Sequence, residues 1–99
     1  RAGNKNINGS SNTFLGSNAG HNNTEGGANI FIGNSTGYNN TEGDNNVFIG
    51  AGSGTNNLSG LRNTFIGTSA GAGAASNNAS DNVFIGYYSG RSIESPITH

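Results

Sequence analysis

The chain has 99 residues, of which 30% are hydrophobic and only 9% are charged, and its formal net charge is −1. Low hydrophobicity produces disorder when it is combined with high net charge, so this nearly neutral composition argues against a disordered chain. The absence of cysteine excludes disulfides, thiolate metal sites and cysteine nucleophiles. The four Lys and Arg residues are scattered, and no apolar run approaches 18 residues, so we expect neither nucleic-acid binding nor membrane insertion.

Residues 1–11 form a polar segment whose one large apolar residue is Ile7. We interpret this segment as a lead-in or a degenerate cap. The pattern changes at residue 12, where a pentapeptide Asn-x-Phe-(Ile/Leu)-Gly begins. It occurs five times, starting at Asn12, Asn29, Asn46, Asn63 and Asn82.

The spacing of the pentapeptides indicates the fold class. The first four starts are 17 residues apart, and the fifth follows after 19. A repeat this short is typical of one coil of a solenoid. The sequence therefore predicts an all-β protein, a β-solenoid of the β-roll or β-helix type, over residues 12–91. Its five coils are expected at 12–28, 29–45, 46–62, 63–81 and 82–91.

Each pentapeptide carries large apolar side chains on both faces of a strand, because successive side chains of a strand alternate in direction. One face holds the Phe column, and the other holds the aliphatic residues that follow each Phe. The Phe column is Phe14, Phe31, Phe48, Phe65 and Phe84. The aliphatic column is Leu15, Ile32, Ile49, Ile66 and Ile85.

A coil of 17 residues has room for one narrow line of core side chains, so both columns cannot lie inside it. The residue before each Phe (Thr13, Ile30, Val47, Thr64 or Val83) shares the Leu/Ile face. That combination predicts the Leu/Ile column as the coil core and the Phe column as an external stripe. An exposed stripe of five Phe side chains would be adhesive, so the sequence predicts a homo-oligomer, a parallel homotrimer, with the Phe column at its interface.

The rest of each coil is built from small residues, Gly and Asn. A small residue followed by Gly recurs after each pentapeptide, as in Ala19-Gly20 and Thr36-Gly37, and predicts an inward small side chain and a corner. A second short strand is expected around Asn22 to Thr24 and its equivalents. The Asn that heads each pentapeptide predicts either a ladder of side-chain amides between coils or a simple turn position. Residues 92–99 include Pro96 and are interpreted as an exit tail.

The unit Asn-x-Phe-Ile-Gly-x-x-(Ala/Ser/Thr)-Gly resembles repeats of bacteriophage tail-fibre and bacterial surface-fibre proteins, which often precede an endosialidase-type intramolecular chaperone. It is also similar to the β-roll heads of trimeric autotransporter adhesins. The 17-residue period is longer than the usual adhesin-head repeat, and Phe stands where that repeat has a small residue. The resemblance covers about residues 12–90. It implies a trimeric segment of an extracellular fibre, on a virion tail or a bacterial surface.

The sequence gives little support for a catalytic site. Glu25 and Glu42 share one repeat position and could in principle bind a cation or act as acid and base, but solvated turn residues are the alternative. No Gly-Gly-x-Gly-x-Asp run of a calcium β-roll is present. His21 and His99 lie in unrelated contexts, and no Ser lies in a nucleophile elbow. We therefore predict no enzyme, no cofactor and no metal.

Partner contact is expected on a variable column that contains His21 and Tyr38, and near the last pentapeptide. Side chains able to stack on sugars or grip carboxylates are His21, Tyr38, Tyr87, Tyr88 and Arg91. A cell-surface glycan or receptor is the expected ligand, and plain exposed residues on a spacer are the alternative.

The predicted function is a structural or adhesive segment of a trimeric fibre, acting as a rigid shaft or as a receptor-facing head for host attachment. The alternative is a monomeric glycan- or ice-binding solenoid that uses one repetitive face. Ice binding calls for ranks of Thr, whereas the column before Phe reads Thr, Ile, Val, Thr, Val.

Overall fold

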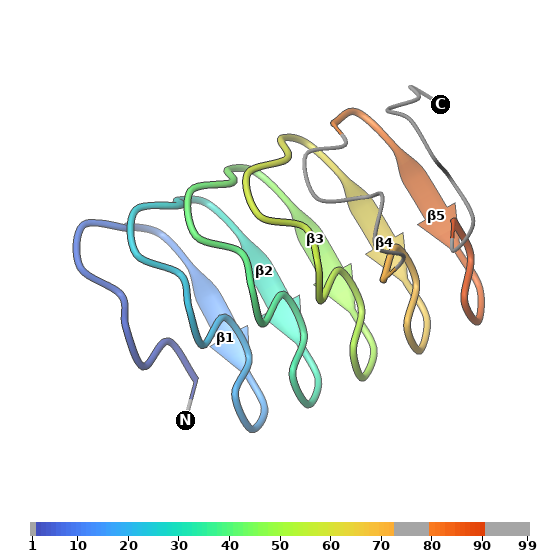
Figure 1. The fold of residues 1–99 in the computed structure, drawn as a ribbon, viewed down its shortest axis with the longest axis horizontal. Coiled ribbons are helices and arrows are strands. Elements are labelled where there is room, and N and C mark those ends of the chain that lie inside the picture. Colours follow the sequence, from blue (N-terminus) through green and yellow to red (C-terminus); the bar gives the residue numbers. More distant parts are fainter. Residues whose placement is uncertain (1, 73–79, 91–99) are drawn as a thin grey trace.

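The fold is a stack of coils that each contribute one short strand to a single parallel sheet (Figure 1). The structure, a computed structural model, describes residues 2–72 and 80–90. The strands are β1 (Thr13–Leu15), β2 (Ile30–Ile32), β3 (Val47–Ile49), β4 (Thr64–Ile66) and β5 (Val83–Ile85). They pair in the order β1-β2-β3-β4-β5. The prediction of an all-β solenoid with parallel strands is confirmed.

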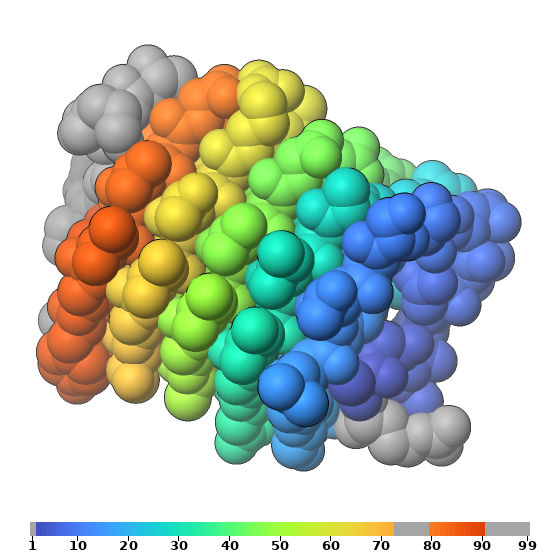
Figure 2. Space-filling model, turned by 180° about the vertical axis from the view of Figure 1, so that it is seen from behind, coloured from blue at the N-terminus to red at the C-terminus, as the bar shows by residue number. Residues whose placement is uncertain are grey.

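Neighbouring strands pair in a register that places equivalent repeat positions side by side. Thr13 pairs with Ile30, and Phe14 with Phe31, and the same register holds for every later pair of strands. Each repeat position therefore forms a column along the stack, and the coils lie as successive layers in the space-filling view (Figure 2). Any property shared by a repeat position becomes a continuous stripe on the molecule.

The half of each coil that lies opposite the strand differs from the prediction. Residues 22–24, where the sequence predicts a second strand, form turns and irregular backbone, and so do their equivalents in the described coils. Backbone hydrogen bonds still join the coils there, as from the Asn22 N–H to the Tyr38 carbonyl at 3.1 Å. Residues 2–11 add similar bonds, such as the Ile7 N–H to the Thr24 carbonyl at 2.9 Å. The lead-in segment thus packs on the first coil without a strand of its own.

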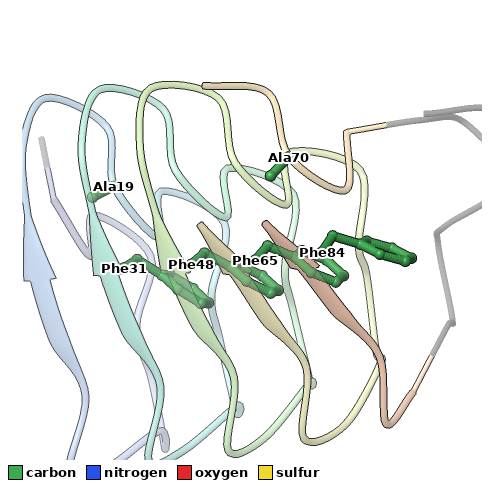
Figure 3. Close-up of a cluster of buried hydrophobic side chains, with 6 residues drawn as sticks. All are labelled: Ala19, Phe31, Phe48, Phe65, Ala70 and Phe84. Carbon is green, nitrogen blue, oxygen red and sulfur yellow. The ribbon is translucent and has the colours of Figure 1, made fainter. Parts of the chain in front are cut away.

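The Phe column lies inside the coils. Phe31, Phe48 and Phe65 are completely buried within the single chain, and Phe84 is 5% exposed. Successive rings stack almost flat on one another, with centroids 4.7 to 5.1 Å apart along the column. Figure 3 shows the buried rings as a row along the stack, with Ala19 and Ala70 nearby in the core. The prediction of an inward small residue is correct at Ala19, Thr36, Ser53 and Ala70, which are all fully buried.

The sequence-based assignment of the two faces is therefore wrong. Phe14, Phe31, Phe48, Phe65 and Phe84 form the hydrophobic core of the chain rather than an interface between chains. Leu15, Ile32, Ile49, Ile66 and Ile85 point outward instead of forming the coil core; Leu15 is 64% and Ile85 65% exposed. The physical reason is that a three-residue strand sends its central side chain one way and both flanking side chains the other. A narrow coil accepts the single central residue.

The glycine that follows each inward small residue makes room for the ring. Gly54 has φ +62°, and a Cβ there would lie 2.4 Å from a ring carbon of Phe48. A Cβ at Gly71 would likewise lie 2.3 Å from a ring carbon of Phe65. Because the ring packs directly against the Cα, this corner accepts no side chain. The core of each coil is thus one Phe ring closed between its strand and a glycine corner.

Candidate functional site

The outward side of the sheet carries the residues immediately before and after each Phe, and we call it the aliphatic face. One column is Thr13, Ile30, Val47, Thr64 and Val83, and the other is Leu15, Ile32, Ile49, Ile66 and Ile85. None of these ten side chains is fully buried, and Leu15, Ile30, Ile66, Val83 and Ile85 are among the exposed large hydrophobic residues. At about 4.8 Å per strand, the face is about 19 Å long.

The chemistry of the aliphatic face is uniform. Eight of its ten side chains are aliphatic, the other two are Thr, and none carries a charge. Soluble monomers rarely expose a continuous apolar patch of this kind, and larger ones mark sites of interaction. The face has no acid, base or nucleophile stronger than a Thr hydroxyl, so it is suited to packing rather than to catalysis.

The head Asn column forms the amide ladder that the sequence offers as one alternative. The Oδ1 of Asn29 accepts the backbone N–H of Asn46 at 2.9 Å, and the Oδ1 of Asn46 accepts that of Asn63 at 2.9 Å. The Asn46 Nδ2 also donates to the Gly60 carbonyl at 2.9 Å. The left-handed turn position belongs to the residue before the Asn, such as Asn45 with φ +61°. The ladder holds successive strands in register beneath the aliphatic face.

A second amide ladder lies in the opposite half of the coil and was missed by sequence reasoning. The Asn40 Nδ2 donates to the Asn23 Oδ1 at 2.9 Å, and both residues are fully buried. Their neighbours form a more accessible ladder, with the Asn22 Nδ2 donating to the Asn39 Oδ1 at 3.1 Å. The available signal was the Asn-Asn pair that recurs at one repeat position in three coils. Both ladders stabilise the stack.

Four of the five residues predicted to contact a ligand form two separate aromatic pairs. His21 and Tyr38 are half-buried, and their rings stack with centroids 4.8 Å apart and an interplanar angle of 2°. The His21 Nδ1 also lies 3.0 Å from the Asn22 Oδ1. Tyr87 and Tyr88 are exposed and meet edge to face at 4.7 Å in the last coil. Arg91 lies outside the described residues.

Among residues 2–72 and 80–90, one ion pair is present, between Arg62 and Asp81. The Arg62 Nε and a second guanidinium nitrogen donate to the two carboxylate oxygens of Asp81 at 2.5 and 2.8 Å. The hydrogen bond and the positive charge lower the pKa of Asp81, although desolvation opposes them, and the same contact raises the pKa of Arg62. Both side chains are well exposed, so the pair contributes little to stability.

The acids discussed as a cation site do not form one in the described residues. Glu25 and Glu42 are exposed, and the Asp44 Oδ1 accepts the Gly27 N–H at 2.7 Å. Within residues 2–72 and 80–90, no three His, Cys, Asp or Glu side chains gather as metal ligands. That part of the chain also has no pocket. The aliphatic face is therefore the main candidate site.

No family model, curated protein or solved structure matches the chain. The described residues include no helix that is long and apolar enough to span a membrane.

Proposed function

We propose that the chain is a structural and adhesive segment of a trimeric fibre, in which the aliphatic face joins the three copies. The observation that carries the proposal is the coexistence of two apolar systems on the same strands. The Phe column already gives each coil a closed core, so the exposed Ile and Leu side chains are not needed inside the chain. Their burial against other copies would contribute up to about 1.5–3 kcal/mol for each fully buried side chain.

The two columns of the aliphatic face suit a cyclic arrangement. The column before Phe mixes Thr, Ile and Val, whereas the column after Phe is Leu and Ile throughout. Around a threefold axis, the first column of one copy packs against the second column of the next, which is a heterologous contact that closes into a ring. The absence of charge lets all three faces meet at the axis without an unpaired ion.

The resemblance to tail-fibre and surface-fibre repeats supports the biological setting of this proposal. Three copies of the chain, each a stack of coils, form a rigid rod when they join along the aliphatic face. Such a rod serves as a shaft or as a receptor-facing head. The aromatic pair of His21 and Tyr38 and the exposed Tyr87 and Tyr88 lie outside the aliphatic face, so they remain available for a cell-surface glycan or receptor in the trimer.

The mass of the native particle tests the proposal when two matched variants are compared. Ile66→Lys adds a charge to the aliphatic face, whereas Thr68→Lys adds the same charge to an exposed position just beyond β4. We expect chains in multiples of three for the natural sequence and for Thr68→Lys, and separated but folded chains for Ile66→Lys. Equal masses for the two variants would contradict the assignment of the interface.

A monomeric ligand-binding solenoid is the second candidate. The pair of His21 and Tyr38 favours it, because two partly exposed rings with polar groups are held rigidly in one column, and such side chains can contact a sugar. Ice binding by the aliphatic face is the related alternative. Native chains that sediment singly, together with glycan binding lost in Tyr38→Ala or with measurable thermal hysteresis, would support this candidate over the trimer.

A further inference from the structure

The lead-in segment, residues 2–11, contains the same turn that the later coils form opposite the strand. The N–H groups of Asn8 and Gly9 donate to the Thr24 carbonyl at 2.9 and 3.1 Å, and the equivalent groups one coil later donate to the Thr41 carbonyl. In each of these turns a residue with a side chain precedes Gly, as Asn8-Gly9, Glu25-Gly26, Glu42-Gly43 and Ser59-Gly60. Asn8 thus belongs to a column that is acidic in the next two coils.

The side chains of this column point into solvent. Asn8, Glu25 and Glu42 are all exposed. Glu25 and Glu42 have a coil on each side, so the outward direction of the position exposes these side chains, rather than a place at one end of the stack. Within residues 2–72 and 80–90, the Asn8 side chain makes no hydrogen bond.

An exposed asparagine that is followed by Gly has a chemical route to lose ammonia. The Gly9 nitrogen attacks the side-chain carbonyl carbon of Asn8, and a new N–C bond forms. The Asn8 amide group leaves as ammonia with the proton of the Gly9 N–H. Water then opens the cyclic imide at one carbonyl or the other, which gives aspartate or isoaspartate. Gly9 has no Cβ to hinder the attack, and Asn8 is the one asparagine of the sequence that Gly follows.

The fold sets one condition on this reaction. The Gly9 N–H donates to the Thr24 carbonyl, which also accepts the N–H groups of Ile7 and Asn8, and the Gly9 bond of 3.1 Å is the longest of the three. This bond must open before the nitrogen can attack. Local opening costs least where a segment has little regular pairing, and residues 2–11 contribute no strand to the sheet.

We propose that Asn8 is a site of spontaneous deamidation, and that the reaction loosens residues 2–11 from the first coil. The product adds a carboxylate one coil away from Glu25, and like charges at neighbouring positions of a sheet-like stack repel. Isoaspartate also lengthens the backbone by one carbon, which disrupts the shared bonds to the Thr24 carbonyl. The inference concerns the loop half of the coil and is independent of the proposed trimer.

Loosening of the lead-in segment would uncover the first ring of the core. The Gly3 N–H donates to the Ala19 carbonyl at 2.8 Å, and a Cβ at Gly3 would lie 3.0 Å from a ring carbon of Phe14. Gly3 thus covers part of the Phe14 ring, whose other neighbour in the column is Phe31. Deamidation would act as a slow, one-way change at this end of the Phe column.

Ageing of the intact protein at mildly alkaline pH tests the site, with peptide mass mapping to locate each converted residue. We expect conversion at Asn8 to be at least tenfold faster than at Asn34, an exposed asparagine that is followed by Ser. Asn8→Ser is the matched control, because Ser59 occupies the same position in the third coil. The natural chain unfolded in urea gives the rate without the bond to the Thr24 carbonyl.

Two results would overturn the site. One is conversion that begins at Asn34 or at another asparagine, with an equal gain in mass for Asn8→Ser. The other is conversion of Asn8 in urea but not in the folded chain, which would mean that the Thr24 carbonyl keeps the Gly9 nitrogen from reacting.

Hydrogen exchange of the Gly3 and Ile7 amides tests the consequence, because both bond to the first coil. We expect exchange at least tenfold faster in converted chains than in Asn8→Ser. A smaller increase is expected for Asn8→Asp, which has the charge of the product without the longer backbone. Equal exchange in converted and fresh chains would contradict the loosening of residues 2–11.

Discussion

The two faces of the sheet consist of the same three-residue strands, yet they differ in almost every physical respect. On the inward face, one Phe per coil is enclosed and stacked at 4.7 to 5.1 Å on its neighbours. On the outward face, two smaller side chains per coil, eight of the ten aliphatic, remain at least partly accessible. The comparison shows that the number of side chains which fit in the coil, rather than the amount of apolar surface, decides which face becomes the core.

The inward face should be the more sensitive to truncation. Phe48→Ser is expected to reduce the free energy of unfolding of the separated chain by about 3–5 kcal/mol, because it opens a cavity in a column of fully buried rings. Ile49→Ser on the outward face should change it far less. Urea denaturation of both variants in the Ile66→Lys background measures the difference. A larger loss for Ile49→Ser would reverse the assignment of the faces.

The glycine corner opposite each ring should be nearly as sensitive. In Gly54→Ala the new methyl group overlaps the Phe48 ring, and we expect a loss of about 1–3 kcal/mol from overpacking. The residue also has φ +62°, which adds about 1–2 kcal/mol for a left-handed alanine. Gly52→Ala has the backbone cost of a left-handed alanine but does not overlap a ring. Thermal unfolding of the two variants separates ring packing from backbone strain, and equal losses would argue against a tight corner.

The buried amide ladder should contribute less than the rings. Asn46→Ala removes an Oδ1 that accepts the Asn63 N–H and leaves that donor buried, at a cost of about 1–3 kcal/mol. Asn39→Ala in the more accessible ladder should cost less, because water can replace the lost bonds. Hydrogen exchange of the Asn63 amide is the direct measurement. If the Asn63 amide is equally protected in Asn46→Ala, the ladder does not hold neighbouring strands in register.

The exposed ion pair should have the smallest effect. Because the Arg62 contact lowers the pKa of Asp81, the pair stabilises the fold above the ordinary Asp value of 3.8. This contribution is lost as the pH falls below that value through the lowered pKa. Asp81→Asn should therefore be slightly less stable than the natural sequence at neutral pH, and the two should converge in acid. A constant difference across that range would rule out the ion pair as its cause.

Much of the fold could be predicted from the sequence, because a fixed spacing of Asn-x-Phe-Ile-Gly becomes a fixed register. The columns, the parallel sheet and the inward Ala19 and Ser53 follow from that spacing. Hydrophobicity alone could not show which face of each strand points into the coil, since both faces are apolar. A usable signal was present: each Phe is followed six residues later by Gly, as in Phe48 and Gly54, and a ring needs such a neighbour.

The candidate site was less accessible to sequence reasoning. The expected interface was an exposed apolar stripe, and such a stripe exists, but it is formed by Leu15, Ile66 and their columns rather than by Phe. The loop half of the coil was also predicted wrongly as a second strand. In the pair Asn22-Asn23, the Asn22 side chain bonds to the next coil, and the Asn23 side chain donates to the Gly26 carbonyl within its own turn.

The solvent exposure of the Phe rings tests the central claim most directly. Fluorinated phenylalanine, incorporated at all five positions, reports solvent contact through the change in the ¹⁹F shift between H₂O and D₂O. We predict no solvent response for the rings of Phe31, Phe48 and Phe65, either in the native assembly or in chains separated by Ile66→Lys. Rings that become exposed when the chains separate would contradict the account, because they would lie between chains rather than inside them.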